Sequence, residues 1–408
     1  MFQFVQDHLP LPPENRCRYL QRNPRWWQRN AANQYCQEVL DKVVNNYKFD
    51  HKLCPGVRNA LCSKRCILEF GGLQNVCTVE IRQTMKRGAF FCRAKIRVVL
   101  SSCFKEEWKE RTGNVAAHAI RGDRPEMEDR FVINENIVPG VSVFAVFDGH
   151  NGELAVNFVR SRLMEDLSRK ITGLHELIHS PSKHASKSTD LADYFTTEGA
   201  INYVQVMHDV FLLTDETLLA EERKESPKNI NYRSGSTALI ALIEGSTLYV
   251  ANVGDSRGVM CDYQGQTKEL SIDHKPERAC EKERIEAAGG FIASAYPGSK
   301  IFRTNGDLSM SRAFGDLHLK EQKVLTANPE ILTFDLSEHK PQFMILATDG
   351  LWHTFGNEES VNFVGRELRK PDFGAKRLTK AAYSRGRGSS DNITVMVINL
   401  SKIIWPSR

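Results

Sequence analysis

Four acidic clusters have the composition of a binding site for divalent cations. Each lies beside an expected strand end or turn, and their carboxylates are Glu128 with Asp129, then Asp148, Asp349 and Asp391. Asp148 and Asp349 each follow an apolar run and precede a glycine, so a carboxylate and a backbone carbonyl can face one side of a sheet. Hard cations such as Mg²⁺ and Mn²⁺ prefer such oxygen ligands and offset the repulsion between gathered carboxylates.

Each cluster taken alone has an ordinary structural explanation. Asp-Gly is first of all a turn signal. A single histidine such as His150 is commonly structural, and a single arginine such as Arg124 is commonly a solvated surface charge. The hypothesis of a metal site therefore depends on the joint presence and order of the clusters, and a role in turns stays open for each of them.

Short apolar runs separated by turn residues position these clusters from about residue 114 onward. They predict buried strands over 141–147, 236–243, 247–253, 342–347 and 393–399. Helical patterns between them cover about 152–170, 197–222, 277–288, 358–368 and 373–383. Two pairs of strands are joined by short turns, which favours antiparallel pairing. We predict an α+β domain of antiparallel sheets flanked by helices, with a Ser/Lys-rich surface loop at 180–190.

Several segments, taken in order, resemble those of a known enzyme family. They are 124–129, 144–150, 234–238, 251–257, 273–276, 284–290, 309–316, 346–352 and 391–394. On these segments the chain resembles the metal-dependent, type 2C protein phosphatases over roughly 114–400. Within that family it is most similar to the epsilon-type branch, on residues 127–131, 290–292, 332–336 and 372–376.

The resemblance implies a fold and a reaction. The fold is a four-layer sandwich of two antiparallel β-sheets flanked by α-helices, with the metals in a cleft at one end. The reaction is hydrolysis of phosphoserine or phosphothreonine in proteins by a hydroxide that bridges two Mg²⁺ or Mn²⁺ ions. Signalling, through stress-activated kinase cascades, is the implied context. The partners would be phosphorylated proteins, and no nucleophilic cysteine is required.

The resemblance also assigns the metal ligands by matching position. Asp148 would bridge both ions, and the Gly149 carbonyl would bind one of them. The remaining carboxylates divide between the two ions, with Asp349 and Asp391 completing one site and Glu128 and Asp129 supporting the other, partly through water. Arg124 would clamp the phosphate, because a guanidinium suits two oxygens. His150 would protonate the leaving oxygen as general acid.

A weaker third ion is left open by the same comparison. Asp255 and Asp349 match family ligands of this ion. The family usually supplies another aspartate four residues after Asp349, but here that position is His353. Histidine is a poorer ligand for Mg²⁺ than for Mn²⁺. Asp273 and Asp316, in two of the matched segments, are equally consistent with structural roles.

Two functions other than an active protein phosphatase are compatible with parts of this pattern. A catalytically dead relative that serves as a scaffold should have lost a metal carboxylate or the phosphate arginine, and none is missing. A metal-dependent hydrolase of small phosphoesters has the same chemistry, and residue spacing leaves it open. The family motifs favour a protein substrate.

The first 113 residues differ in charge and composition from the rest. They hold 20 Lys and Arg against 10 Asp and Glu, whereas the whole chain has a net charge of only +5, so the remainder is acidic. Eight of the ten cysteines also precede residue 104. We therefore predict a basic, Cys-containing extension of weak structure over 1–113 and a catalytic domain over 114–402.

Three hypotheses remain open for the extension. One is a zinc site of irregular spacing formed by His51, Cys54, Cys62 and Cys66. Another is contact of the basic, apolar stretch 86–104 with an anionic membrane surface. The third is a basic segment without a defined role. Trp26 and Trp27 could stack on nucleic acid, but no nucleic-acid partner is expected.

The length of the apolar stretches bears on the expected cellular location of the protein. No stretch reaches the ~18 apolar residues that a membrane-spanning helix needs. Epsilon-type relatives carry an N-terminal membrane anchor, and this sequence departs from them there. We expect a cytoplasmic monomer without a secretory signal, and leave nuclear and membrane-associated locations open.

Overall fold

The computed structural model describes residues 107–179, 191–225, 233–296, 298–386 and 391–401, together with three strands nearer the N-terminus. The chain divides into two units, Met1–Leu100 and Ser101–Arg408. The proposed zinc ligands, the membrane-contact stretch, Trp26, Trp27 and the loop 180–190 lie outside the residues whose side chains are described.

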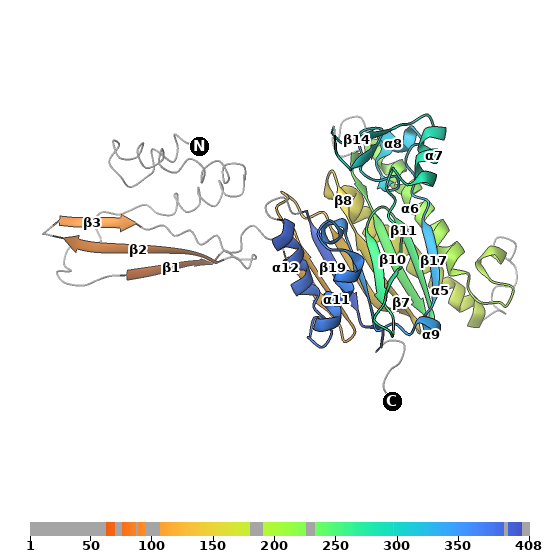
Figure 1. Ribbon diagram of the computed structural model, residues 1–408, viewed down its shortest axis with the longest axis horizontal. Coiled ribbons are helices and arrows are strands. Elements are labelled where there is room, and N and C mark those ends of the chain that lie inside the picture. Colours follow the sequence, from red (N-terminus) through yellow and green to blue (C-terminus); the bar gives the residue numbers. More distant parts are fainter. Residues whose placement is uncertain are drawn as a thin grey trace. The chain divides into compact units, whose positions relative to one another are not determined.

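The first unit contains a three-stranded antiparallel sheet in the order β1-β2-β3 (Figure 1). Its strands are β1 (Ser63–Glu69), β2 (Val76–Lys86) and β3 (Ala89–Ala94). This differs from the weak structure expected for 1–113. The alternation of apolar and polar residues in Val79-Glu80-Ile81-Arg82 is the strand signal that could have indicated it.

The second unit is built on two antiparallel sheets (Figure 1). The five-stranded sheet has the order β17 (Glu330–Asp335), β11 (Thr247–Val253), β10 (Ala238–Glu244), β7 (Val141–Phe147) and β6 (Arg130–Val138). The six-stranded sheet has the order β13 (Thr267–Glu269), β12 (Arg257–Cys261), β18 (Phe343–Ala347), β19 (Ile393–Ile398), β5 (Val115–Ile120) and β4 (Glu107–Arg111). The antiparallel pairing predicted from the sequence is confirmed.

Helices cover the outer face of each sheet. On the five-stranded sheet they are α5 (Glu153–His179) and α6 (Tyr203–Glu225). On the six-stranded sheet they are α10 (Asp349–Trp352), α11 (Asn357–Glu367) and α12 (Ala375–Gly386). The predicted four-layer α+β sandwich is therefore confirmed, and the predicted helices all form, with boundaries shifted by a few residues and α5 extended to His179.

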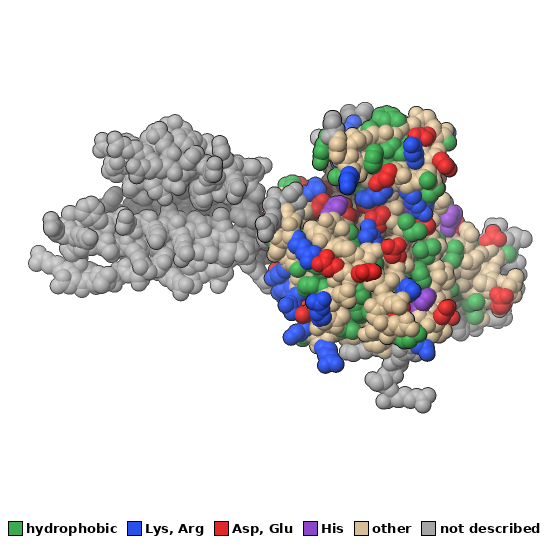
Figure 2. Space-filling view, in the orientation of Figure 1, with side chains coloured by type: hydrophobic (Ala, Val, Ile, Leu, Met, Phe, Trp, Pro, Cys, Tyr) green, Lys and Arg blue, Asp and Glu red, His purple; other side chains and the backbone are tan. Residues whose placement is uncertain are grey.

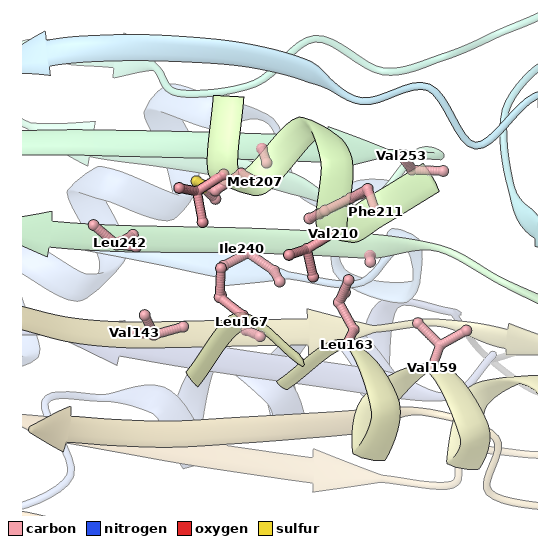
Figure 3. Close-up of a cluster of buried hydrophobic side chains, with 14 of the residues drawn as sticks. Val143, Val159, Leu163, Leu167, Met207, Val210, Phe211, Ile240, Leu242 and Val253 are labelled. Carbon is pink, nitrogen blue, oxygen red and sulfur yellow. The ribbon is translucent and has the colours of Figure 1, made fainter. Parts of the chain in front are cut away.

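Strand β7 shows why the predicted strands are apolar without alternation. Its Val143 and Phe147 pack with α5 and α6, whereas Phe144 and Val146 pack between the two sheets. Both faces of the strand are buried, so both need apolar side chains. In Figure 3 Val143 of β7 and Ile240 of β10 lie against Leu163 and Leu167 of α5 and against Met207 and Phe211 of α6.

The remaining elements lie at the rim of the sandwich. A small sheet of β16 (Phe314–Gly315), β9 (Gly235–Ser236) and β8 (Gly149–His150) continues from β7 and β10. A separate subdomain contains α7 (Ala279–Ala287), the hairpin β14 (Ile292–Ser294) and β15 (Phe302–Thr304), and α8 (Leu317–Glu321). Two short helices, η2 (Ala192–Tyr194) and α9 (Leu336–His339), complete the described elements.

The fold of the second unit begins before residue 114, the start of this domain predicted from the sequence. Strand β4 pairs with β5 from Glu107↔Ile120 to Arg111↔Ala116, so it belongs to the six-stranded sheet. The predicted boundary at residue 114 leaves this strand out. Its residues are mainly charged and exposed, which is typical of an edge strand and gives little apolar signal.

A buried glutamate joins α7 to the loop that leads into α8. Glu281 is 1% exposed and accepts hydrogen bonds from Arg284 and Arg312. Arg284 also donates to the Ser311 carbonyl, and Arg312 donates to the Asn328 carbonyl. Burial alone would raise the pKa of Glu281, but Arg312, with Ser311 and Arg284, outweighs it and lowers the pKa to about 2.

This network predicts a loss of stability in acid. The folded pKa of Glu281 is below its ordinary 4.5, so its contribution is complete above about pH 4.5 and is lost as the pH falls toward 2. The shift corresponds to about 3 kcal/mol. Glu281→Gln should lower the melting temperature at pH 7 and narrow the difference between the pH 7 and pH 3 melting temperatures. Equal pH dependence in both proteins would contradict this assignment.

Candidate metal centre and active site

The topology brings the predicted metal carboxylates to the ends of paired strands. Arg130 of β6 pairs with Phe147 of β7, so the preceding Asp129 and the following Asp148 lie at one end of the five-stranded sheet. Ala347 of β18 pairs with Val395 of β19, which places Asp349 and Asp391 together at the end of the other sheet. In each antiparallel pair, the residues that follow one strand therefore lie beside the residues that precede the other strand.

Asp129 connects the two sheets. Its side chain is fully buried, and Oδ2 accepts hydrogen bonds from Thr348 Oγ1 at 2.8 Å and Thr394 Oγ1 at 2.7 Å. These threonines flank Asp349 and Asp391 in the six-stranded sheet. The other oxygen, Oδ1, is buried and has no hydrogen-bond partner. Burial raises the pKa of Asp129 to about 8.

Asp148 and Asp349 share this environment. Burial and then the charge of Asp349 raise the pKa of Asp148 well above its ordinary range. Burial and then the charge of Asp255 raise the pKa of Asp349 to about 6. Asp391 contributes to the shift of both groups. Mutual repulsion of buried carboxylates indicates a site that a cation would stabilise.

The neighbouring segment that carries Glu128 is fixed by Asn392. The Asn392 amide oxygen accepts the Glu128 backbone N–H at 2.6 Å, and its Nδ2 donates to the carbonyls of Arg121 and Glu126. The Glu128 carboxylate accepts the Gly152 N–H at 2.5 Å, and burial raises its pKa. The residue after Asp391 thus holds a second acidic cluster, 264 residues away in the chain, beside the first.

Side-chain cations contact several of these carboxylates. Arg124 donates to Asp391, and its side chain is 56% exposed. The partly buried Lys275 donates to Asp255, whose Oδ1 is buried and unpartnered. His353 lies 3.6 Å from Asp349, Nε2 to Oδ2. On the face in view in Figure 2, acidic and basic side chains lie close together over the described part of the catalytic unit.

The donor set fits hard divalent cations. The candidates supply carboxylate oxygens and a backbone carbonyl, and two buried oxygens, Oδ1 of Asp129 and Oδ1 of Asp255, have no protein partner. As the side chains stand, no three His, Cys, Asp or Glu side chains among the described residues converge in metal-coordinating positions. The carboxylates that Arg124 and Lys275 now engage, Asp391 and Asp255, would therefore have to be released and reoriented before they could share an ion.

His150 follows the candidate ligand Gly149 and contacts a second carboxylate. Its Nε2 lies 2.7 Å from Oδ2 of Asp316, which is 1% exposed. Burial alone would lower the pKa of His150, but the charge and hydrogen bond of Asp316 outweigh it and raise the pKa. Asp316 thus favours the protonated form of the imidazole, which is the form that a general acid needs.

Several residues of the site have no role predicted from the sequence. They are Lys275, Thr348, Thr394 and Asn392, all lying in or beside the matched segments, and Asp316, for which a structural role had stayed open. Only Lys275 had a readable signal, because it is a lone cation in the Asp-His-Lys-Pro segment between apolar elements.

The family follows from comparison with known proteins. The profile of the Protein phosphatase 2C family matches residues 113–393. The chain belongs to this family and is accordingly a metal-dependent serine/threonine protein phosphatase by class. The resemblance noted in the sequence is confirmed.

Among individual relatives, the chain is similar to Protein phosphatase 1L of Bos taurus. The two are 40% identical over 304 residues, which is 74% of this chain and 76% of the relative. Probable protein phosphatase 2C 76 of Arabidopsis thaliana is 36% identical over 71% of this chain and 60% of its own length.

Solved structures share the fold. A serine-threonine phosphatase 2C from Toxoplasma gondii aligns with a TM-score of 0.59 and 23% identity, covering 72% of this chain and 98% of its own. A sex-determining protein of C. elegans aligns with a TM-score of 0.55 over 72% of this chain and 68% of its own. At this identity the likeness supports the architecture alone.

No helix among the described residues is long and apolar enough to cross a membrane.

Proposed function

We propose that the chain hydrolyses phosphoserine and phosphothreonine in proteins with a centre of two Mg²⁺ or Mn²⁺ ions. The ligands would be Asp148, the Gly149 carbonyl, Asp349 and Asp391, supported by Glu128 and Asp129. The ions would supply an acidified bridging water as nucleophile and positive charge for the phosphate oxygens. The observation that carries the proposal is the meeting of carboxylates from both sheets, of which Asp129 is fully buried and the others partly buried, with raised pKa values and an unpartnered Asp129 oxygen.

The chain's own residues supply the binding of phosphate and the proton. Arg124 is exposed at the edge of the carboxylates, so its guanidinium can exchange Asp391 for two phosphate oxygens. As the bond between phosphorus and the serine or threonine Oγ breaks, His150 transfers its proton to Oγ. The products are a free hydroxyl and inorganic phosphate, and the neutral imidazole regains a proton from solvent.

Phosphate release from a phosphothreonine peptide tests this proposal. Release should require Mn²⁺ or Mg²⁺ and stop with EDTA. The value of kcat/KM should be at least about tenfold higher for the peptide than for glycerol phosphate. A preference for the small ester would instead favour a hydrolase of small phosphoesters, and full activity in EDTA would exclude the two-metal mechanism.

Removal of the Arg124 guanidinium is expected to weaken binding of the phosphate. Arg124→Ala should raise KM for the phosphothreonine peptide about tenfold or more, since a charge-assisted hydrogen bond contributes about 1.5–3 kcal/mol. Arg124→Lys should recover only part of this, because an ammonium cannot make the paired contact. The exposed Arg160→Ala on α5 is the control. An unchanged KM in Arg124→Ala would contradict the assignment.

We propose a weak site for a third ion at Asp255 and Asp349. His353 lies beside this site and would lower its affinity for Mg²⁺. Lys275 already engages Asp255, and an imidazole replaces the family's aspartate, so affinity for Mg²⁺ should be low. Calorimetric titration with Mg²⁺ should count two sites in the wild type and a third, weaker one in His353→Asp. Three sites of similar affinity in the wild type would refute this.

We further propose that the protein acts in signalling. We expect it to be a monomer and to lie in the cytoplasm, with nuclear or membrane-associated locations as alternatives. The resemblance of the sequence to the epsilon-type branch is the basis of the signalling role, and the similarity to Protein phosphatase 1L supports a protein phosphatase. Sedimentation of the purified chain tests the monomer, and imaging of the tagged full-length chain with and without residues 1–106 tests the location.

A further inference from the structure

A group of buried charged side chains lies behind His150, on the side formed by α6 and α8. Asp316 precedes α8, and its Oδ2 is 2.7 Å from His150 Nε2. A carboxylate only accepts hydrogen bonds, so the imidazole N–H must be the donor. Because Nε2 is engaged in this way, Nδ1 is the remaining ring nitrogen, and it is buried with no protein partner.

The backbone around Asp316 is built to hold that carboxylate in place. Asp316 has φ +52°, in the left-handed region that aspartate and asparagine tolerate better than most residues. Its own N–H donates to the Ser234 carbonyl at 3.0 Å. The preceding Gly315 N–H donates to Asp215 Oδ1 on α6 at 3.0 Å, and Lys320 of α8 donates to Asp215 Oδ2.

The facing strand β9 approaches the pair closely. A Cβ built on Gly235 would lie 2.2 Å from Asp316 Oδ2 and 2.4 Å from His150 Nε2. Only a residue without a side chain therefore allows β9 to cover the contact between the histidine and the aspartate. The close packing of β9 against the pair therefore explains why the Ser-Gly-Ser-Thr segment has a glycine at position 235.

A second buried carboxyl, that of Glu222, lies nearby. Glu222 of α6 is 4% exposed, and neither of its side-chain oxygens has a hydrogen-bond partner. Burial and the charges of Asp316 and Asp215 raise the pKa of Glu222 to about 8. Lys320 and the Leu317 backbone N–H partly offset this rise, so Glu222 belongs to the same group of buried charges as Asp316 and Asp215.

We propose that Asp316 is a positioning residue that holds the imidazole of His150 by Nε2, so that Nδ1 delivers the proton to the leaving oxygen. Asp215 and Lys320 act one step further out, by fixing the turn that carries Asp316. The inference rests on the proposed function, because it requires His150 to be the general acid. It assigns a catalytic purpose to a residue 166 positions away in the chain.

Dependence on the leaving group separates positioning from a general structural role. A phosphothreonine ester releases a poor leaving group that needs a proton, whereas p-nitrophenol leaves with little help, having a pKa of about 7. Asp316→Asn keeps the side-chain shape and suits the left-handed backbone. It should lower kcat for the phosphothreonine peptide about 30- to 100-fold with KM within about threefold, and lower p-nitrophenyl phosphate turnover less than about threefold.

Three further measurements complete the test. In a His150→Gln background, Asp316→Asn should add less than about twofold, because the two residues act as one unit. Asp307→Asn removes the carboxylate of another His–Asp pair, with His318 at 2.8 Å, and is the control that should leave both substrates unaffected. If Asp316→Asn does not fold, the imidazole N–H resonance of His150 in the wild type, identified by its loss in His150→Gln, should show a strongly hydrogen-bonded, slowly exchanging proton.

Other outcomes overturn either the inference or the proposed function. Equal losses on both substrates, additive losses in the double variant or a rapidly exchanging His150 proton would overturn the positioning role while leaving the phosphatase assignment intact. A wild-type protein without metal-dependent activity on either substrate would overturn the proposed function itself.

Discussion

Asp349→Asn is expected to lower kcat/KM for a phosphothreonine peptide by about 10³-fold or more while leaving the fold intact. A loss of about 4 kcal/mol in transition-state stabilisation corresponds to this factor, and it is the scale expected when a metal site loses a carboxylate. Asparagine keeps the shape of the side chain. The exposed Asp193→Asn, far from the strand ends that carry the site, should retain full activity.

The same variant makes a second prediction that is independent of turnover. Asp349 contributes to the repulsion that raises the pKa of Asp148, so its neutral replacement removes an unfavourable buried charge. In EDTA the melting temperature of Asp349→Asn should equal or exceed that of the wild type. The rise on adding Mn²⁺ should be much smaller in the variant, since stabilisation by a ligand of the folded state grows with its affinity.

A structural explanation of Asp349 makes the opposite predictions. If the residue only formed the Asp-Gly turn, Asp349→Asn would keep both activity and the full stabilisation by Mn²⁺, because asparagine serves equally well in turns. A variant that is inactive but binds Mn²⁺ like the wild type would mean that Asp349 does not coordinate the metals directly. Thermal shift and activity, measured on the same sample, distinguish these cases.

Local patterns in the sequence predict the strands and the residues at their ends. Asp148 and Asp349 are visible because each follows an apolar run and precedes a glycine. The four-layer arrangement is likewise implied by runs such as that of β7, which have no polar face. Strand β4 escapes prediction because its five residues are four charges and a tryptophan.

Contacts between distant segments are not visible in such patterns. Thr394 lies 265 residues from Asp129, and His150 lies 166 residues from Asp316. The first pair joins residues of two different sheets, and the second joins the outer strands of the small sheet β16-β9-β8; no local periodicity specifies either arrangement. Lys275 is 20 residues from Asp255, beyond the reach of a helix or hairpin pattern. The ligands can therefore be proposed from sequence, whereas the groups that orient and compete for them require the fold.

Gly350→Ala is expected to disrupt both folding and catalysis. A Cβ at this position would lie 2.1 Å from the Asn392 carbonyl oxygen and 3.0 Å from Ile393 Cγ1. The oxygen belongs to the backbone, so it cannot move without shifting the start of β19. Overpacking of this kind costs about 1–3 kcal/mol and occasionally more. We expect a loss of about 3 kcal/mol in the free energy of unfolding, measured by urea denaturation.

The effect should reach the metal site because of what Asn392 holds. Its side chain contacts the backbone of Arg121, Glu126 and Glu128, and its neighbour is Asp391. A shift of about 1 Å would displace two acidic clusters together, and misplacement on that scale can cost about 100-fold in rate. The folded fraction of Gly350→Ala should therefore lose at least that factor and bind Mn²⁺ weakly.

Gly365→Ala is the matched control, because it makes the same chemical change where there is room. Gly365 lies in α11, and a methyl group added there would meet nothing within 4 Å beyond its own helix backbone. Alanine should therefore raise stability by about 0.4–1 kcal/mol and leave activity unchanged. Opposite signs for the two variants would show that the glycine of the Asp-Gly pair is required for the approach of β19. Equal, small effects would mean that the backbone at Asn392 yields easily, and that the position of Asp391 does not depend on Gly350.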